Sequence, residues 1–214
     1  MKSMDRVKKA SVKVGSHDDS AVRVLRLERE NARLKRSLAR LRIFRSMAYR
    51  DPLTNMWNRR YFEERLKEEF SRAERAGTAR CFSVAVIDVN AFKDINDQHG
   101  HLVGDDVLRW VGAFLVANLR AHDVACRTGG DEFMVLLPDL SAADAGQVIG
   151  RLRAQLDRSN AERDLPVSLS IGSASWPDVS QSCEMLLARA DAAMYQDKRG
   201  RRVPRPIEVY RTAA

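Results

Sequence analysis

The chain has 214 residues, enough for one domain of ordinary size and an extension, and its apolar content of 44% is sufficient for a packed core. The net charge of +8 belongs to residues 1–50, which hold 15 Lys and Arg against 5 Asp and Glu, whereas residues 51–214 hold 22 against 24. No stretch approaches the ~18 apolar residues of a membrane span, and no signal peptide is visible. The three cysteines are widely spaced and fit neither a disulfide framework nor a zinc site. We therefore expect a reduced, soluble, cytoplasmic protein with no membrane contact.

The basic extension divides into a tail and a helix. Residues 1–21 are rich in lysine and then in small polar residues, which predicts a disordered tail. Residues 22–50 follow a heptad pattern, which predicts a coiled-coil dimerisation helix, and a lone asparagine at an a position favours a parallel, in-register pair. The predicted d residues are Leu27, Leu34 and Leu41, and the predicted a residues are Val24, Asn31 and Leu38.

Two other interpretations of this extension are open. The helix of residues 22–50 could pack, as a single amphipathic helix, on its own domain. A basic segment before heptads is also typical of a leucine-zipper DNA binder, in which the basic helix runs without a break into the zipper. Residues 15–20, which begin with glycine, predict such a break, so a nucleic-acid partner is not expected.

The larger part of the chain, 51–214, predicts a single α/β domain. Short β-branched apolar runs alternate with amphipathic stretches. A two-glycine hairpin between two strands makes the central sheet mixed rather than doubly wound, with helices flanking it. The expected elements are helix 59–76, strand 82–89, helix 103–119, strands 124–128 and 132–138, helix 141–158, strand 167–175, helix 182–197 and strand 206–210.

Acidic residues gather at the ends of two of these strands. Gly129 and Gly130 form the expected hairpin turn, and Asp131 and Glu132 follow at its mouth. Asp88 ends a buried strand, at the edge where α/β sheets place their ligands. Carboxylates packed together repel one another unless a cation lies between them, and such an oxygen site suits Mg²⁺ with substrate phosphates. The pattern indicates phosphoryl or nucleotidyl transfer, with an ordinary turn bearing solvated acids as the alternative.

Polar residues after the first of these acids fit a nucleotide. Lys93 is a point charge for phosphate. Asn96 and Asp105 could together read a purine edge, because Asp accepts from the N1–H and amino group that guanine has and adenine lacks. Each residue also has a plain structural alternative, Lys93 as a solvated charge and the other two as helix-end caps.

Seven sequence blocks in order resemble the GGDEF family of diguanylate cyclases. Several specific blocks in family order indicate a family far better than one motif does. The resemblance implies a fold like that of nucleotidyl cyclases and the palm of polymerases. It also implies that two GTP molecules, one on each of two facing domains, condense to cyclic di-3′,5′-GMP with release of two pyrophosphates. The blocks fall within residues 51–203 and are 51–54, 58–62, 87–97, 100–105, 128–133, 168–172 and 190–195.

The resemblance also implies roles for single residues. Asp88, the carbonyl of Val89 and Asp131 would bind Mg²⁺ or Mn²⁺, and Asp131 would be the base for the 3′-hydroxyl, with Glu132 required beside it. Lys93 would steady the phosphates during transfer. The residues that would bind substrate are Phe92, Asn96, His101, Asp105, Gly129, Gly130, Lys198 and Arg202, with Arg201 as the alternative to Arg202.

A regulatory site and one departure complete the comparison with the family. Arg120 and Asp123 match the family's R-x-x-D motif for product inhibition by cyclic di-GMP, at the family's distance from Gly129, with Arg151 as a second arm. An ordinary surface ion pair is the alternative. Asn90 stands where many members have a second aspartate, which removes one negative charge from the metal site. The alternative function is a domain that binds cyclic di-GMP or GTP without turnover.

Overall fold

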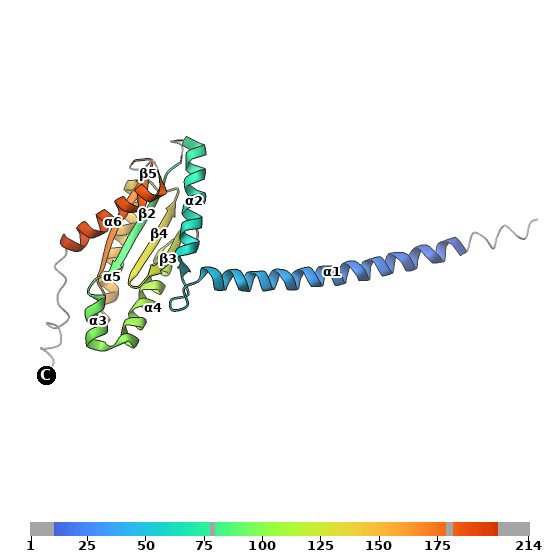
Figure 1. The fold of residues 1–214 in the computed structure, drawn as a ribbon, viewed down its shortest axis with the longest axis horizontal. Helices are drawn as coiled ribbons and strands as arrows, with labels where there is room; N and C mark the ends of the chain where they lie inside the picture. Colours follow the sequence, from blue (N-terminus) through green and yellow to red (C-terminus); the bar gives the residue numbers. More distant parts are fainter. Residues whose placement is uncertain (1–10, 78–79, 179–181, 201–214) are drawn as a thin grey trace, which may run out of the picture. The chain divides into compact units, whose positions relative to one another are not determined.

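In this computed structural model the chain divides into two compact units, Met1–Ala48 and Tyr49–Ala214 (Figure 1). The structure describes residues 11–77, 80–178 and 182–200. The division lies close to the predicted boundary between residues 50 and 51. Over the described ranges, none of the helices combines the length and the apolar character needed to cross a membrane.

The first unit is helical from residue 11 onward. The helix α1 (Ser11–Tyr49) runs through residues 15–20, so the predicted tail over 1–21 is wrong for residues 11–21, and residues 1–10 lie outside the described part. One glycine costs a helix only about 1 kcal/mol, and a long helix continues through it because each added residue gains a hydrogen bond. The apolar heptad side chains Val24, Leu27, Leu34, Leu38 and Leu41 are between 52% and 63% exposed in the chain.

The second unit contains a mixed five-stranded sheet in the order β1-β3-β4-β2-β5, which confirms the predicted fold class. β2 lies inside the sheet and pairs antiparallel with both β4 and β5, whereas β1 pairs parallel with β3. All eight residues of β2 are buried, as expected for a continuous apolar run. The strands are β1 (Trp57–Asn58), β2 (Phe82–Val89), β3 (Val124–Gly129), β4 (Glu132–Pro138) and β5 (Leu169–Trp176).

Helices cover both faces of this sheet, because successive side chains of a strand point to opposite sides. Ala85, Ile87 and Val89 of β2 belong to the core formed with α4 and α5. Val84 and Val86 belong to the core formed with α2 and α6 (Figure 1). The helices of this unit are α2 (Arg59–Ala76), α3 (Phe92–His99), α4 (His101–Asn118), α5 (Ala142–Asn160) and α6 (Cys183–Gly200).

Two differences from the predicted elements bear on the site. The helix expected over 103–119 is α4, which begins at His101 and follows a separate helix, α3, that the sequence did not predict. The two helices meet at Gly100, whose φ of +84° favours glycine and ends α3. The short strand β1 was also not predicted, and the strand expected over 206–210 lies outside the described residues.

α6 packs very closely on the sheet. Gly172 of β5 leaves no room for a side chain, because a Cβ there would collide with the backbone nitrogen of Met194. This contact fixes the height of α6 above β5. It therefore helps to set where Lys198, one turn further along α6, can reach.

Candidate active site

The sheet brings the predicted acids together at one edge. The antiparallel register pairs Asp88 of β2 with Glu132 of β4. The backbone N–H of Val89 donates to the carbonyl oxygen of Asp131 at 3.2 Å, which extends this pairing into the hairpin turn. Two pairs of residues far apart in the chain, Asp88 with Glu132 and Val89 with Asp131, thus meet at one strand end.

Arg127 holds the hairpin turn through hydrogen bonds to its backbone. Gly130 has a φ of +47°, which favours glycine, and its carbonyl accepts from Arg127 Nε at 2.9 Å and Arg127 Nη2 at 2.8 Å. The same guanidinium donates through Nη1 to both carboxylate oxygens of Asp51, at 3.1 and 3.2 Å. A single cation therefore ties the turn to the segment that follows α1.

Asp51 is itself well satisfied. Its Oδ1 accepts from the Thr54 amide at 2.8 Å and from the Thr54 hydroxyl at 2.7 Å. Burial of this carboxyl would raise its pKa, but the hydrogen bonds from Thr54 and Arg127 outweigh that effect and lower the pKa of Asp51 below its ordinary value. The carboxylate therefore stays ionised and holds Arg127 in place. Sequence reasoning assigned no site role to Arg127 or Asp51.

Lys198 reaches this edge from the other side of the sheet. Its Nζ lies 2.7 Å from Oδ1 of Asp88, whose side chain is only 11% exposed. The preceding residue, Asp197, accepts from the Ile171 backbone N–H at 2.9 Å and pairs with Arg153 at 2.9 Å, so this end of α6 is fixed to β5 and α5. The carboxylate at the end of β2 thus already contacts a cation.

Asn90 is turned away from these carboxylates. Its Nδ2 donates to the Ser168 hydroxyl at 2.9 Å, and its Oδ1 accepts from the Ser170 hydroxyl at 2.6 Å. The side chain is 3% exposed, and both ends of its amide are satisfied. The residue that departs from the family pattern therefore holds the end of β2 against β5.

The predicted nucleotide residues lie on α3 and α4. A side chain at Gly104 would collide with Asn96, so the Asn96 amide lies directly against the first turn of α4 beside Asp105. Asp105 is half-buried and lies 4.0 Å from Arg109, whereas Lys93 and His101 are exposed. Phe92 is partly buried and packs against the core.

The oxygen donors at the end of β2 and in the hairpin turn are of the kind that a hard divalent cation binds, although they are too few to form a complete coordination shell. Among the described residues no three His, Cys, Asp or Glu side chains gather closely enough to hold a metal ion. Asp88 and Asp131 supply two carboxylates and Val89 one carbonyl, which is the donor set that Mg²⁺ takes when substrate phosphates complete its shell. The Lys198 ammonium on Asp88 is independent support that this carboxylate attracts positive charge.

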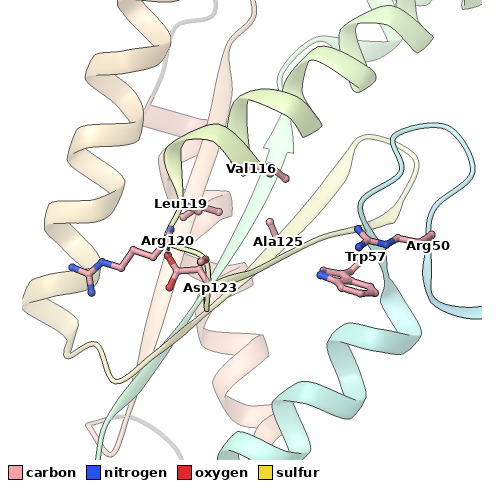
Figure 2. A pocket seen from close by; sticks show the side chains of 8 residues that line it. Arg50, Trp57, Val116, Leu119, Arg120, Asp123 and Ala125 are labelled. Carbon is pink, nitrogen blue, oxygen red and sulfur yellow. Dashed lines mark hydrogen bonds between the residues drawn. The ribbon is translucent and has the colours of Figure 1, made fainter. Parts of the chain in front are cut away.

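The predicted product-binding residues lie elsewhere, along a pocket near the end of α4 (Figure 2). The Asp123 Oδ2 accepts from the backbone N–H of Arg120 at 2.8 Å, and the Arg120 guanidinium extends away from this carboxylate. The surface ion pair that was the alternative to a product site is therefore not formed. Arg151 of α5 donates to the Asn118 carbonyl at 3.2 Å, which brings it to the turn that carries Arg120.

Two predicted residues cannot be placed. Arg201 and Arg202 lie outside the described residues, because the described part of α6 ends at Gly200. Their proposed contact with phosphate stays a prediction.

The similarity to known protein sequences covers mainly the second unit of the chain, which begins at Tyr49. The family model described as "Diguanylate cyclase, GGDEF domain" matches residues 48–203. The response regulator PleD of Caulobacter vibrioides is 39% identical over 157 residues, which are 71% of this chain and 34% of PleD. The diguanylate cyclase DosC of Escherichia coli is 38% identical over 156 residues, 70% of this chain and 33% of DosC. The chain thus spans about a third of the length of these curated relatives.

Solved structures extend the similarity to the N-terminal helix. The diguanylate cyclase SiaD of Pseudomonas aeruginosa, in complex with its activator SiaC, matches with a TM-score of 0.73 and 33% identity over 92% of this chain and 76% of SiaD. The coiled coil and GGDEF domain of DgcB from Caulobacter crescentus, in complex with c-di-GMP, matches with a TM-score of 0.72 and 29% identity, covering 82% of this chain and 93% of that one.

Proposed function

The chain belongs to the GGDEF family of diguanylate cyclases, and from that premise we propose that it condenses two GTP molecules into cyclic di-3′,5′-GMP and two pyrophosphates. The observation that carries the proposal is the convergence of Asp88, Val89, Asp131 and Glu132 at one strand end, with Lys198 on Asp88. The strand pairing and the hairpin turn held by Arg127 bring these acids together, which suits stabilisation of the charge that develops on phosphate during transfer.

In each of two successive steps, a 3′-oxygen attacks the α-phosphorus of the other GTP. A new P–O bond forms, and the bond from that phosphorus to the pyrophosphate oxygen breaks. Asp131 accepts the proton of the attacking hydroxyl, and Glu132 beside it keeps the local potential negative. Lys93 and Lys198 bear the positive charge that the phosphates require. A Mg²⁺ or Mn²⁺ ion held by Asp88, Asp131 and the Val89 carbonyl would supply Lewis-acid stabilisation of the phosphate oxygens.

The choice of guanine rests on the turn between α3 and α4. Asn96 offers both a donor and an acceptor, and the half-buried Asp105 accepts from N1–H and the amino group of guanine. Their proximity follows from the absence of a side chain at Gly104. Adenine lacks both donors at this edge, so ATP would leave Asp105 facing an acceptor. His101 lies at the start of α4 and is exposed, where it can contact the guanosine.

Two chains must face each other, since each domain supplies one nucleotide. We propose that α1 pairs with the same helix of a second chain as a parallel coiled coil. The exposure of its regularly spaced apolar side chains supports this, because such a stripe is stable in water only when it is covered. DgcB, whose solved structure includes a coiled coil with its GGDEF domain, is similar over most of this chain.

Cyclic di-GMP is further proposed to inhibit the enzyme by binding at Arg120, Asp123 and Arg151. Asp123 Oδ1 is buried and has no hydrogen-bond partner among the described residues, so the carboxylate has acceptor capacity that its bond to the Arg120 N–H does not use. Arg120 and Arg151 provide guanidinium groups suited to phosphate and to the guanine Hoogsteen edge. This arrangement would make the product an allosteric ligand, with binding away from the catalytic hairpin.

Two alternatives are weaker. A leucine-zipper DNA binder gains from the unbroken α1, which removes the expected break at residues 15–20. Against it, residues 11–20 hold one lysine and two aspartates, so the helix just before the heptads is not basic. A domain that binds nucleotide without turnover would be expected to lack reactive groups that this chain has, including Asp131 and Lys93.

Chromatography of a reaction mixture tests the proposal. The full chain is incubated with GTP and Mg²⁺, and separately with ATP. We expect one cyclic di-GMP and two pyrophosphates for every two GTP consumed, with little turnover of ATP. Binding of GTP without its consumption would favour the nucleotide-binding alternative, and a salt-dependent DNA mobility shift would favour the other.

A further inference from the structure

β5 is the last strand of the sheet, so one side of its backbone has no strand to pair with. In the sheet order it lies beside β2 alone. At Ile171, in the middle of β5, two side chains satisfy the backbone on this open side. The Ile171 N–H donates to Asp197 Oδ2 at 2.9 Å, and the Ile171 carbonyl accepts from Arg153 Nη2 at 3.2 Å. The two side chains thus take the place that a further strand would occupy at this residue.

Arg153 and Asp197 also pair with each other. Arg153 Nη2 lies 2.9 Å from Asp197 Oδ2, and the two side chains are 35% and 19% exposed. The same nitrogen and the same oxygen therefore serve both the ion pair and the backbone of β5. An ion pair whose members are also hydrogen-bonded to a strand has a defined geometry, unlike a pair between two mobile surface side chains.

The ion pair joins helices that cover opposite faces of the sheet. Arg153 belongs to α5 and Asp197 to α6, so the contact passes around the edge of β5 (Figure 1). Asp197 lies in the last turn of α6, where helix ends fray and where the helix dipole disfavours a negative charge. The guanidinium and the Ile171 N–H compensate for this placement. They fix the last turn of α6 to the strand edge.

Lys198 follows Asp197 directly, and its target lies next to the anchoring point. In the register of β2 and β5, Asp88 pairs with Ser170, the residue before Ile171. The Lys198 ammonium, 2.7 Å from Asp88 Oδ1, is therefore held from a backbone position that is itself anchored close by. A lysine has a flexible stem with several rotatable bonds, so fixing its backbone removes part of the freedom that would otherwise be lost on contact with an anion.

We propose that Arg153 and Asp197 are positioning residues for nucleotide binding. Their ion pair around β5 holds the last turn of α6 so that Lys198 reaches first Asp88 and then the triphosphate. The inference rests on the proposed function, in which Lys198 binds phosphate, and both residues act through that lysine. Simple electrostatics predicts the opposite effect for Asp197, because a negative charge beside Lys198 repels a triphosphate and its removal would strengthen binding.

Calorimetric titration of the full chain tests this with Mg²⁺ and a GTP analogue that has a methylene group between its α- and β-phosphates, so that no turnover follows binding. Asp197→Ala keeps a good helix former in α6 and should weaken binding about five- to tenfold, because the lysine is present but no longer held. Arg153→Met should weaken binding similarly. Arg153→Lys should restore most of the affinity, since an ammonium has N–H donors for both the Asp197 carboxylate and the Ile171 carbonyl.

The matched control is Arg80→Met. Arg80 pairs with Asp139 at 3.0 Å, and its side chain is 39% exposed, close to the 35% of Arg153. It precedes β2, whereas Asp88 lies near the other end of that strand. Arg80→Met should therefore leave the affinity for the analogue unchanged.

Two further measurements separate positioning from a general loosening of the fold. In the Lys198→Met background, Asp197→Ala should cause no additional loss of affinity, because its effect passes through the lysine. Asp197→Ala should also bind Mn²⁺ alone more tightly than the wild type in electron paramagnetic resonance titration, since Lys198 then competes less for Asp88. Removal of a negative charge would by itself weaken Mn²⁺ binding.

The outcomes distinguish this inference from the proposed function. Wild-type or tighter binding of the analogue by Asp197→Ala, with binding weakened by Lys198→Met, would overturn the positioning role and leave the proposed function standing. An equal loss from Asp197→Ala with and without Lys198 would overturn the positioning role as well. No binding of the analogue by the wild type would overturn both. Thermal denaturation checks that each variant is folded, and if Arg153→Met unfolds, Asp197→Ala decides.

Discussion

Lys198 Nζ and Asp88 Oδ1 lie 2.7 Å apart, although the two residues are separated by 110 positions in the chain. The lysine comes from α6 and the carboxylate from the end of β2, and the side chain of Lys198 is 41% exposed whereas that of Asp88 is 11% exposed. Removing one partner of a buried ion pair costs several kcal/mol, so the Lys198 ammonium leaves Asp88 only when another cation replaces it there. We expect a triphosphate that arrives with its metal ion to make this exchange, the metal ion taking Asp88 and Lys198 taking a phosphate.

Replacing Lys198 tests this exchange. Lys198→Met should weaken GTP binding about 10- to 100-fold, because a hydrogen bond from a charged group contributes ~1.5–3 kcal/mol. The same variant should bind Mn²⁺ alone more tightly than the wild type, since Asp88 no longer has a competing cation. Titration followed by Mn²⁺ electron paramagnetic resonance measures the second effect without any turnover.

The neighbouring Arg199, also basic and exposed, provides the control for this prediction. Arg199→Met should change neither affinity. If Lys198→Met and Arg199→Met bind GTP and Mn²⁺ equally well, the contact between Lys198 and Asp88 has no part in nucleotide binding.

Asp51 should make stability dependent on pH. Because its folded pKa lies below the ordinary 3.8, the carboxylate contributes stability that is fully present above about pH 3.8 and is lost as the pH falls through the lower folded pKa. Asp51→Asn should reduce the free energy of unfolding at pH 6, and its difference from wild type should narrow in acid. Denaturant unfolding at several pH values measures this.

Asp157, an exposed aspartate of α5, gives the comparison for that series. Asp157→Asn should follow the wild-type curve at every pH. A constant difference between Asp51→Asn and wild type down to pH 2 would show that the ionised Asp51 does not hold Arg127 and the hairpin.

If α1 forms the proposed coiled coil, activity should depend on dimer assembly. Leu34→Asp places a charge at a d position and should convert dimers to monomers, lowering specific activity and making it rise steeply with protein concentration. Leu25→Asp is the matched control, because Leu25 is 55% exposed and Leu34 56%, but Leu25 lies at position b outside the seam. Sedimentation and turnover are measured on the same samples.

Removal of residues 1–48 extends the same prediction. The remaining domain should fold, stay mostly monomeric and still bind GTP. Full activity of this truncated protein at low micromolar concentration would mean that α1 is not the dimerisation device.

The sequence predicted what depends on local pattern. The apolar run ending at Asp88 and the glycine turn before Asp131 each carry their own periodicity or turn chemistry, and their elements appear close to the expected bounds. The heptads of α1 predicted a helix, but the helix begins at Ser11 rather than at residue 22. The helix α3 was not predicted, because eight residues that end at a glycine are too few to show a clear helical period.

Contacts between distant segments could not be predicted in the same way. The bond of Arg127 to Asp51 joins residues 76 apart, and nothing in either neighbourhood specifies the partner. Asn90 was considered only as a missing charge, whereas its two serine partners on or beside β5 emerge from strand pairing. Only the folded sheet shows that this amide has a structural use.

The central claim is that Asp131 at the hairpin performs GTP condensation. Asp131→Asn keeps the shape of the side chain but removes its charge and its ability to take a proton, which should lower the rate at least about 100-fold with no change in thermal stability. Asp157→Asn, on α5 and far from the hairpin in sequence, should retain the wild-type rate. The deciding measurement is the rate of cyclic di-GMP formation from GTP and Mg²⁺ by the three proteins at equal dimer concentration. The account predicts product from wild type and Asp157→Asn and almost none from Asp131→Asn, and a wild-type rate in Asp131→Asn would contradict it.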